Sequence, residues 1–192
     1  DLRRVLEPLA QAKALPRQTY VDPDIAALES HRLFASVWLC AAHQSELATP
    51  GSFVAVESFG ERTVIVRGAD LELHAWADRC VHRGTQMTEG SSGRLEQLEL
   101  ACPYHGLRYD LTGRVFAPPK QLSHCRGMNL EQAQVAVSNG FVFMNRDPSA
   151  PSFPDCAGSI PPWFEHAAMH ALRLERRTVH EVKANWKLLV AN

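Results

Sequence analysis

Two short stretches of the sequence each place one cysteine and one histidine close together. Cys80 and His82 lie in "RCVHRG", and Cys102 and His105 lie in "CPYHG". Thiolates and imidazoles are the protein ligands that suit soft and borderline metals. Because two side chains rarely hold a metal alone, the two stretches together predict one metal site with four protein ligands.

The order of these ligands separates two kinds of metal site. A structural zinc finger uses the same ligand types, but normally as a cysteine pair followed by a histidine pair. Here each stretch supplies one cysteine and one histidine. A two-iron, two-sulfide cluster with both thiolates on one iron and both imidazoles on the other uses such a mixed supply. The sequence therefore favours a [2Fe–2S] cluster over zinc, with Cys80, His82, Cys102 and His105 as ligands.

The flanking residues suit such a cluster. Neutral imidazoles replace two anionic thiolates, so the potential is expected at roughly −150 to +300 mV, above that of an all-cysteine plant-type cluster. We expect the backbone N–H groups at Gly84 and Gly106 to approach the sulfides with no side chain in the way. Pro103 and Tyr104 are expected to cover one side, and residues 117–119 ("APP") to form a third shielding loop.

Short strands surround the two ligand stretches. From residue 51 onward, runs rich in β-branched and aromatic residues alternate with turn sequences. The predicted strands are "SFVAVES", "RTVIVRG", "LELHAWA", "RLEQLELA", "RVFA", "AQVAVS" and "FVFMN". Each ligand pair follows one of these strands in a turn, so two neighbouring loops can close on one site. The pattern predicts a mainly β fold, a small antiparallel sandwich or barrel.

Other elements are predicted on either side of these strands. Asp22 is a candidate N-cap and Pro23 suits the first helical position, which predicts a helix from Pro23 into the low thirties. "SVWLC" after it predicts a strand. Residues 146–162, rich in proline and small residues, predict a linker. Residues 172–184 predict a long exposed strand, and "NWKLLVAN" predicts the first turns of a helix.

Composition limits the possible partners and compartments. Twenty basic residues balance 21 acidic ones, giving a net charge of −1, whereas a nucleic-acid binder normally shows a basic excess. No apolar run of about 18 residues exists, so no membrane span is expected, and no secretory signal is expected. Five cysteines are an odd number, which argues against a secreted disulfide framework and for the cytoplasm.

The ligand stretches also carry a family resemblance. "RCVHRGTQM" and "LACPYHGLRYDLTGRV" resemble the Rieske domain of the large (α) subunits of Rieske non-haem iron oxygenases, the aromatic-ring-hydroxylating dioxygenase family. The "LPRQTYVDPD" region is similar to that family's N-terminal lead-in, and "VKANWKLLVAN" to the "NWK…EN" segment that opens its catalytic domain. The sequence departs from the family at Leu107, where many members have tryptophan, and at Ala191, where many have glutamate.

The resemblance implies a fold and its boundaries. The expected fold is a Rieske-type antiparallel β-sandwich with an N-terminal helical segment and the start of an α+β catalytic domain. The implied domains are a helical lead-in over 1–38, a Rieske [2Fe–2S] domain over 39–150, and a linker with the beginning of a truncated catalytic domain over 151–192.

The resemblance also implies a function. The chain would relay single electrons from a reductase or ferredoxin to a mononuclear Fe(II) site, for O₂-dependent hydroxylation or demethylation of an organic substrate. The family holds that iron with two histidines and a carboxylate, which are expected beyond Asn192, so no catalytic residue is assigned here. Subunits would assemble head to tail as a homotrimer or higher oligomer, with His82 and His105 as the electron exit.

The main alternative is a stand-alone Rieske ferredoxin, an electron carrier without catalysis. The lead-in, the linker and the "NWK" segment have no role in such a protein, which favours the oxygenase reading. A zinc-stabilised binding domain is disfavoured by the ligand order.

Several other histidines and cysteines are set aside. His166 and His170, spaced i, i+4 beside Glu165, share one helix face, but a lone pair of this kind is a common accident. His124 and Cys125 lack a second pair and are placed at a loop or strand edge. Cys40 is expected to be a buried structural thiol, and Cys156 an exposed one.

Overall fold

The computed structural model describes residues 5, 7–8, 10–158 and 167–190. The chain divides into a larger unit, Ala35–Arg176, and a smaller one, Asp1–Phe34 with Arg177–Asn192. The domain boundaries inferred from the sequence stay predictions. Among the described residues, no helix combines the length and the apolar character that crossing a bilayer would need.

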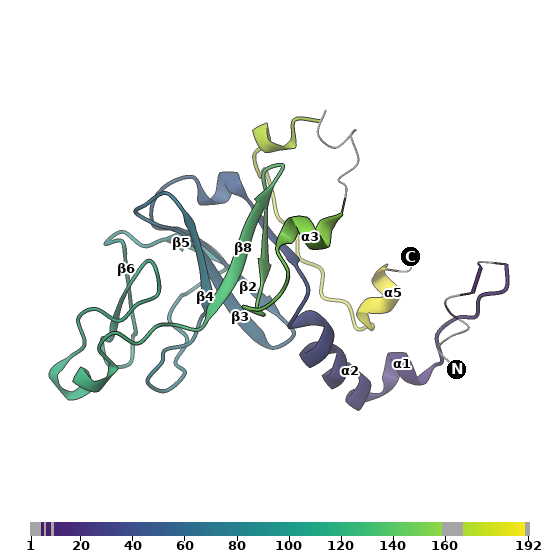
Figure 1. Cartoon of the computed structure of the whole chain (residues 1–192), viewed down its shortest axis with the longest axis horizontal. Helices are drawn as coiled ribbons and strands as arrows, with labels where there is room; N and C mark the ends of the chain where they lie inside the picture. Colours follow the sequence, from purple (N-terminus) through teal and green to yellow (C-terminus); the bar gives the residue numbers. More distant parts are fainter. Residues whose placement is uncertain (1–4, 6, 9, 159–166, 191–192) are drawn as a thin grey trace. The chain divides into compact units, whose positions relative to one another are not determined.

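The larger unit is built on antiparallel strands (Figure 1). Its main sheet has seven strands in the order β1-β9-β8-β4-β3-β2-β5, and a second sheet pairs β6 with β7. The prediction of a mainly β, antiparallel fold is confirmed. In chain order the strands are β1 (Leu39–His43), β2 (Ser52–Ser58), β3 (Glu61–Arg67), β4 (Leu73–Ala77), β5 (Ser92–Arg94), β6 (Glu99–Ala101), β7 (Arg108–Asp110), β8 (Gln132–Ser138) and β9 (Phe141–Asn145).

The central strands of the main sheet are buried on both faces. Successive side chains of a strand point to opposite faces, and here they divide between two hydrophobic cores. The first core takes one alternating set together with the residues around the ligand loops; its strand members are Phe53, Ala55, Val64, Val66 and Trp76. The second core takes the other set, with Val54, Ile65, Ala75, Val142 and Met144. The first core is the one that supports the metal-binding stretches.

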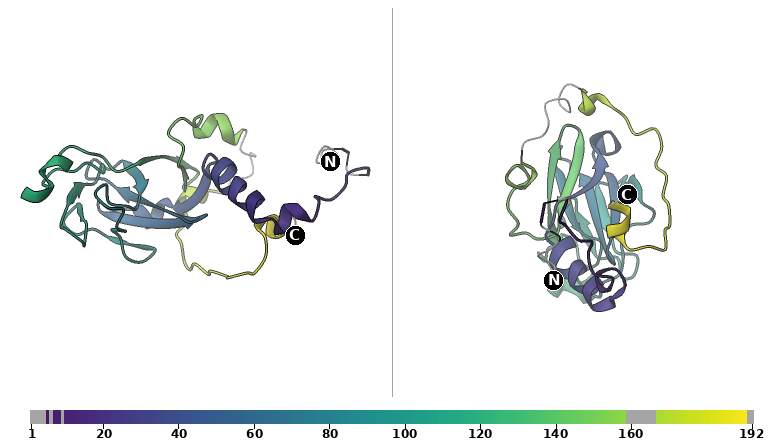
Figure 2. Two further views of the ribbon diagram at one scale, coloured as in Figure 1. Left: turned by 90° about the horizontal axis from the view of Figure 1, so that it is seen from below. Right: turned by 90° about the vertical axis from the view of Figure 1, so that its right-hand side faces the viewer.

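Some predicted strands differ from those observed. "RLEQLELA" does not form one strand, because Leu98 adopts a φ of +51° and separates β5 from β6. "RVFA" makes only isolated bridges, from Arg114 to Asn129 and from Val115 to Tyr109. The strand predicted over 172–184 is wrong: within the described part of the chain these residues have no ladder partner and run as coil (Figure 2). An exposed β-pattern needs a neighbouring strand to become a sheet.

The predicted linker contains a short helix that packs against other residues of the larger unit. Helix α3 (Phe153–Ala157) places Phe153 against two rings, stacked on Phe143 at 4.3 Å and edge-on to Trp38 at 5.5 Å between centroids. The indole Nε1 of Trp38 donates to the carbonyl of Pro151 at 3.1 Å. This part of the linker is therefore held against β1 and β9. Its last predicted residues, 159–162, lie outside the described ranges.

The smaller unit joins helices from both ends of the sequence. It contains α1 (Gln18–Val21), α2 (Pro23–Glu29), the π-helical turn η2 (Ser30–Phe34) and α5 (Trp186–Val190). The predicted helix start is confirmed, since the Asp22 carboxylate caps α2 by accepting from the N–H of Asp24 at 2.9 Å. Glu29 accepts a hydrogen bond from Trp186 Nε1 at 2.9 Å and one from Lys187 Nζ at 2.5 Å. The "NWK" segment is therefore clamped to the lead-in helix.

The charge on Glu29 should stabilise this clamp. Burial opposes ionisation, but hydrogen bonds from Lys187 and Trp186 outweigh it and lower the pKa of Glu29. We expect Glu29→Gln to lose about 1 kcal/mol at pH 7, because the ion pair is removed while an acceptor oxygen remains, and to lower Tm by roughly 2–4 °C. Thermal unfolding of both proteins at pH 7 measures this.

The pH dependence provides the control for this variant. A carboxyl with a lowered folded-state pKa stabilises the protein above its unfolded-state pKa, near 4.3, and the benefit is lost as the pH falls through the folded-state value. The difference between wild type and Glu29→Gln should therefore shrink toward pH 3. Equal Tm values at pH 7 would contradict the clamp.

Candidate metal centre

The two ligand stretches form loops with the same backbone design. In the Cys80 loop (residues 80–85), the N–H of Gly84 donates to the carbonyl of Cys80 at 2.8 Å. In the Cys102 loop (residues 102–107), the N–H of Gly106 donates to the carbonyl of Cys102 at 2.9 Å. In each loop the cysteine N–H is also bonded to the carbonyl five residues on, at 2.9 Å and 2.8 Å. The histidine, however, is the second residue after the cysteine in one loop and the third in the other.

The two glycines serve the shape of the loops. Gly84 and Gly106 both have φ of +69°, a conformation that glycine adopts without steric cost. Their N–H groups donate to carbonyls inside the loops, and the approach of backbone N–H groups here to the sulfides stays a prediction. The backbone N–H groups that do reach a ligand sulfur belong to Tyr104 and His105, and they bind the thiol of Cys102.

The two thiols lie together inside the protein. Cys80 and Cys102 are 4% and 3% exposed, are not joined by a disulfide and interact with each other. Burial raises the pKa of the Cys102 thiol, the N–H groups of Tyr104 and His105 oppose this, and the neighbouring Cys80 adds to it. Without a cation beside it, the Cys102 sulfur therefore favours its neutral, protonated form.

A buried tyrosine contacts the thiol pair. Tyr109 is fully buried, with its hydroxyl oxygen 3.1 Å from Cys80 Sγ, and it accepts from the N–H of Val81 at 3.2 Å. Desolvation, followed by the contact with Cys80, raises the pKa of the Tyr109 phenol. The phenol therefore keeps its proton and can donate it in a hydrogen bond to a Cys80 thiolate.

The two imidazoles also lie together, nearer to the surface. The rings of His82 and His105 have centroids 5.0 Å apart, with His105 exposed and His82 half-buried. Desolvation, then the charges of Arg83, His105 and His124, lower the pKa of His82. A lowered pKa favours the neutral imidazole, which is the form that binds a metal.

The four donors are therefore sorted by chemical type, with thiols inside and imidazoles outside. In the ranges that the structure describes, no three histidine, cysteine, aspartate or glutamate residues gather as one metal ion would require. Two thiolates beside each other and two imidazoles beside each other suit a group with two metal atoms, each held by one kind of ligand. The donor set and its placement fit a [2Fe–2S] cluster.

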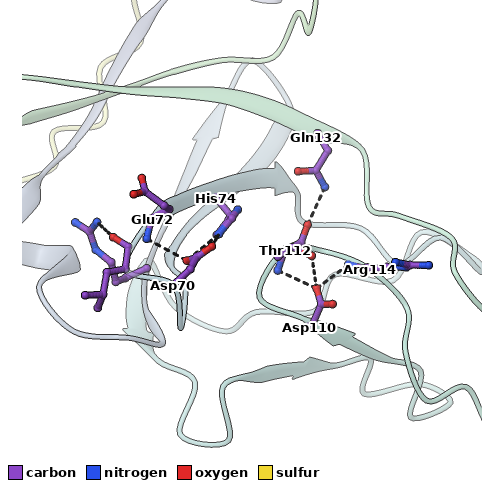
Figure 3. Close-up of polar contacts among 9 residues, drawn as sticks. Asp70, Glu72, His74, Asp110, Thr112, Arg114 and Gln132 are labelled. Carbon is purple, nitrogen blue, oxygen red and sulfur yellow. Dashed lines mark hydrogen bonds and ion pairs between the residues drawn. The ribbon is translucent and has the colours of Figure 1, made fainter.

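The Cys102 loop is followed by a tight turn, residues 110–114, that the side chain of Asp110 holds together. The Asp110 Oδ1 atom accepts from the N–H of Thr112 at 2.9 Å, its hydroxyl at 2.5 Å and the N–H of Arg114 at 3.1 Å (Figure 3). This turn returns the chain so that Val115 forms a bridge with Tyr109. Leu107, where the family often has tryptophan, is fully buried in the first core. Loop and turn together fix the phenol against Cys80.

A third histidine lies beside the imidazole pair, and sequence reasoning missed it. The "APP" segment leads into the 3₁₀ helix η4 (Lys120–Cys125), on which the His124 ring lies 6.5 Å from that of His82. The placement of His124 at a loop or strand edge is therefore wrong. Leu122 and Cys125 anchor η4 in the first core. No spacing in the sequence links His124 to the ligand stretches, since the contact depends on how η4 packs.

The remaining candidates lie outside the site. Cys40 is exposed rather than buried, because a β-bulge between Cys40 and Ala42 interrupts the alternation of β1, so that Ala42 is buried and Cys40 is not. Cys156 is exposed, as predicted. His170 is exposed on the 3₁₀ turn η5 (Met169–Ala171), where its carbonyl accepts from Gln44 Nε2 at 3.0 Å. His166 and Glu165 lie outside the described residues.

Comparison with known proteins agrees with this geometry. The model of the Rieske [2Fe–2S] domain family matches residues 37–135. The carnitine monooxygenase oxygenase subunit of Escherichia coli (strain K12) is 33% identical over 189 residues, which are 95% of this chain and 50% of that protein. The glycine betaine monooxygenase oxygenase subunit of Pseudomonas aeruginosa is 25% identical over 182 residues, 93% of this chain and 42% of that one.

A solved structure is similar over the same extent. It is a quaternary ammonium Rieske monooxygenase, described for carnitine oxidation and inter-subunit electron transfer. Its TM-score is 0.81 at 31% identity, covering 91% of this chain and 49% of that one. The chain thus spans about half the length of the curated relatives it matches.

Proposed function

Because this chain belongs to the Rieske [2Fe–2S] domain family, we propose that it is the electron-relay part of an oxygenase α subunit. It would receive single electrons from a reductase or ferredoxin and pass them to a mononuclear iron site in a part of the protein that this chain does not include. There, O₂-dependent hydroxylation or demethylation of an organic substrate would occur. The observation that carries the proposal is the sorting of four donors into a buried thiol pair and an outer imidazole pair.

We assign Cys80 and Cys102 as ligands of one iron, and His82 and His105 as ligands of the other. The contact between the thiols and the 5.0 Å separation of the imidazole rings support this assignment. A [2Fe–2S] cluster bound there would supply one-electron redox chemistry.

The residues of the chain have distinct tasks at this site. The first core keeps water from the sulfurs. The hydroxyl of Tyr109 and the N–H groups of Tyr104 and His105 donate hydrogen bonds to the two thiolates, and hydrogen bonds to ligand sulfurs are one way in which a protein sets the potential. The exposed ring of His105 would present the imidazole side of the site to solvent or to a partner.

The alternative of a stand-alone Rieske ferredoxin is less well supported. The relatives that match 93–95% of this chain are oxygenase subunits, so the match extends well beyond the strands and ligand loops. In this chain the lead-in and the "NWK" segment contact each other through Glu29, Trp186 and Lys187. An electron carrier made of strands and ligand loops alone would not need this clamp.

Metal analysis of the purified protein tests the ligand assignment. We expect two irons and two acid-labile sulfides per chain, and His105→Cys should lower the midpoint potential because an anionic thiolate replaces a neutral imidazole. His124→Ala is the matched control, since His124 lies beside His82 but is not assigned as a ligand, and it should keep both irons. A single zinc per chain, or an unchanged midpoint in His105→Cys, would contradict the assignment.

The phenol of Tyr109 should raise the potential. Its hydrogen bond is stronger to the reduced, more negative cluster, and hydrogen bonds to charged groups contribute about 1.5–3 kcal/mol. A difference of about 1 kcal/mol between the redox states corresponds to roughly 40 mV for one electron. We expect Tyr109→Phe to lower the midpoint by about this amount in a redox titration.

Tyr104→Phe is the control for this measurement. Tyr104 is 57% exposed and its ring stacks on His105 at 3.9 Å, so losing its hydroxyl should leave the midpoint nearly unchanged. Equal shifts in the two variants would argue against a specific bond from Tyr109 to Cys80.

We further propose that the oxygenase acts on a quaternary ammonium compound and works as a homotrimer or higher oligomer. The names of the similar proteins support the substrate class, and the inter-subunit electron transfer described for the solved structure supports the assembly. The full-length protein that contains this chain, supplied with a reductase, should consume O₂ with carnitine or glycine betaine. Turnover of an aromatic acid such as anthranilate, without turnover of carnitine or glycine betaine, would overturn the proposed substrate class.

A further inference from the structure

Asp78 is a buried carboxylate directly before the Cys80 loop. Its side chain is fully inaccessible to solvent, and among the described residues it is the one Asp, Glu, Lys or Arg classed as buried. Burying a carboxylate is costly unless it is paired and hydrogen-bonded. A carboxylate at such a position therefore indicates a structural role that an apolar side chain could not perform.

The carboxylate of Asp78 binds Arg62 on β3 and also the segment that follows the Cys80 loop, at Met87 and Thr88. Its Oδ2 atom accepts from Arg62 Nε at 2.8 Å and from the Thr88 hydroxyl at 2.5 Å, and its Oδ1 atom accepts from the N–H groups of Met87 and Thr88 at 3.0 and 3.2 Å. Its own N–H donates to the carbonyl of Arg62 at 2.9 Å. With two donors on each oxygen, Asp78 has no free lone pair for a metal.

Arg62 extends this network across the base of the loop. Its Nη2 atom donates to the hydroxyl of Thr88 at 3.3 Å and also to the carbonyl of Gly90. Arg62 belongs to β3, an interior strand of the main sheet whose residues 63–66 are all buried. The residues that enter and leave the Cys80 loop are therefore both attached to this buried strand.

The other ligand loop has no need of such a network. The Cys102 loop is flanked by β6 and β7, which pair as a ladder from Glu99↔Asp110 to Ala101↔Arg108. The Cys80 loop follows β4, but no strand leaves it until β5 begins at Ser92. A side-chain network around Asp78 takes the place that backbone pairing has under the Cys102 loop.

We infer that Asp78, together with Arg62 and Thr88, is a positioning residue that closes the base of the Cys80 loop and so fixes Cys80 beside Cys102. It acts through Cys80 and does not touch the metal. The inference rests on the proposed function, because the loop is argued to hold a cluster ligand.

The test is Asp78→Asn, which keeps the size of the side chain and one acceptor oxygen for the two N–H groups. Its amide NH₂ cannot accept from Arg62 or Thr88. In the protein as purified, we expect amide hydrogen exchange over residues 80–88 to quicken by roughly tenfold or more, with β2 and β3 unchanged. We also expect iron below two per chain, and a shifted or broadened EPR spectrum of the reduced cluster that remains.

Asp70→Asn is the matched control. Asp70 also accepts a backbone N–H, from Glu72 at 3.0 Å, and contacts His74 Nε2 at 3.0 Å (Figure 3), but its side chain is 49% exposed and it lies in the turn before β4, outside both ligand loops. This variant should keep the wild-type exchange, iron content and spectrum. A purely general effect of losing an aspartate would appear in both variants.

The outcomes separate the possible failures. Wild-type exchange, iron content and spectrum in Asp78→Asn would overturn the inference. If Asp78→Asn does not fold, Thr88→Val removes only the hydroxyl that donates to Asp78 and accepts from Arg62, and it should still alter the EPR spectrum. An unaltered spectrum would overturn the inference. If the wild-type protein holds no [2Fe–2S] cluster, the proposed function fails, whereas hydrogen exchange still decides whether Asp78 holds the loop.

Discussion

The structure depends on keeping two cysteine thiols side by side in a dry core without a disulfide. Burial raises the pKa of Cys102, and the proximity of Cys80 raises it further. Two thiolates in this place would repel each other and lack solvation, so the site favours negative sulfurs only when a cation binds between them. Metal binding and loop structure are thus coupled, because a bound cation offsets the free-energy cost of burying two negatively charged sulfurs beside each other.

The main sheet can keep the two thiols away from water because its strands contribute side chains to two hydrophobic cores. In β3, Val64 and Val66 face the first core while Ile65 faces the second. The second core closes the sheet against β1 and β9, and the first is left to support the ligand loops. The loops are therefore attached to a sheet that is packed against a second core on its other face.

The fold class, and the pairing of Cys80 with Cys102 and of His82 with His105, could be predicted because their signals are local. The mixed cysteine–histidine spacing, the β-rich runs and the Asp22–Pro23 helix start each lie within a few residues. The misses all depend on contacts between distant residues. The 172–184 segment lacks a partner strand, His124 reaches His82 through the packing of η4, and Asp78 meets Arg62 across 16 positions. Cys40 was misplaced because β1 has a bulge between Cys40 and Ala42 where it pairs with β9, and this bulge leaves Cys40 exposed.

The two loops show how one backbone design can serve two ligand types. Each loop closes with the same pair of hydrogen bonds and the same glycine at the fifth position. Within this frame the cysteine is the first residue and points into the core, whereas the histidine comes later, toward the rim. A buried thiolate needs hydrogen-bond donors and a nearby cation in place of water, and the core side of each loop supplies donors to Cys102. Neutral imidazoles tolerate contact with water, so they fit the more exposed side. The order cysteine before histidine in both loops therefore places the imidazole pair at the more exposed end of the site.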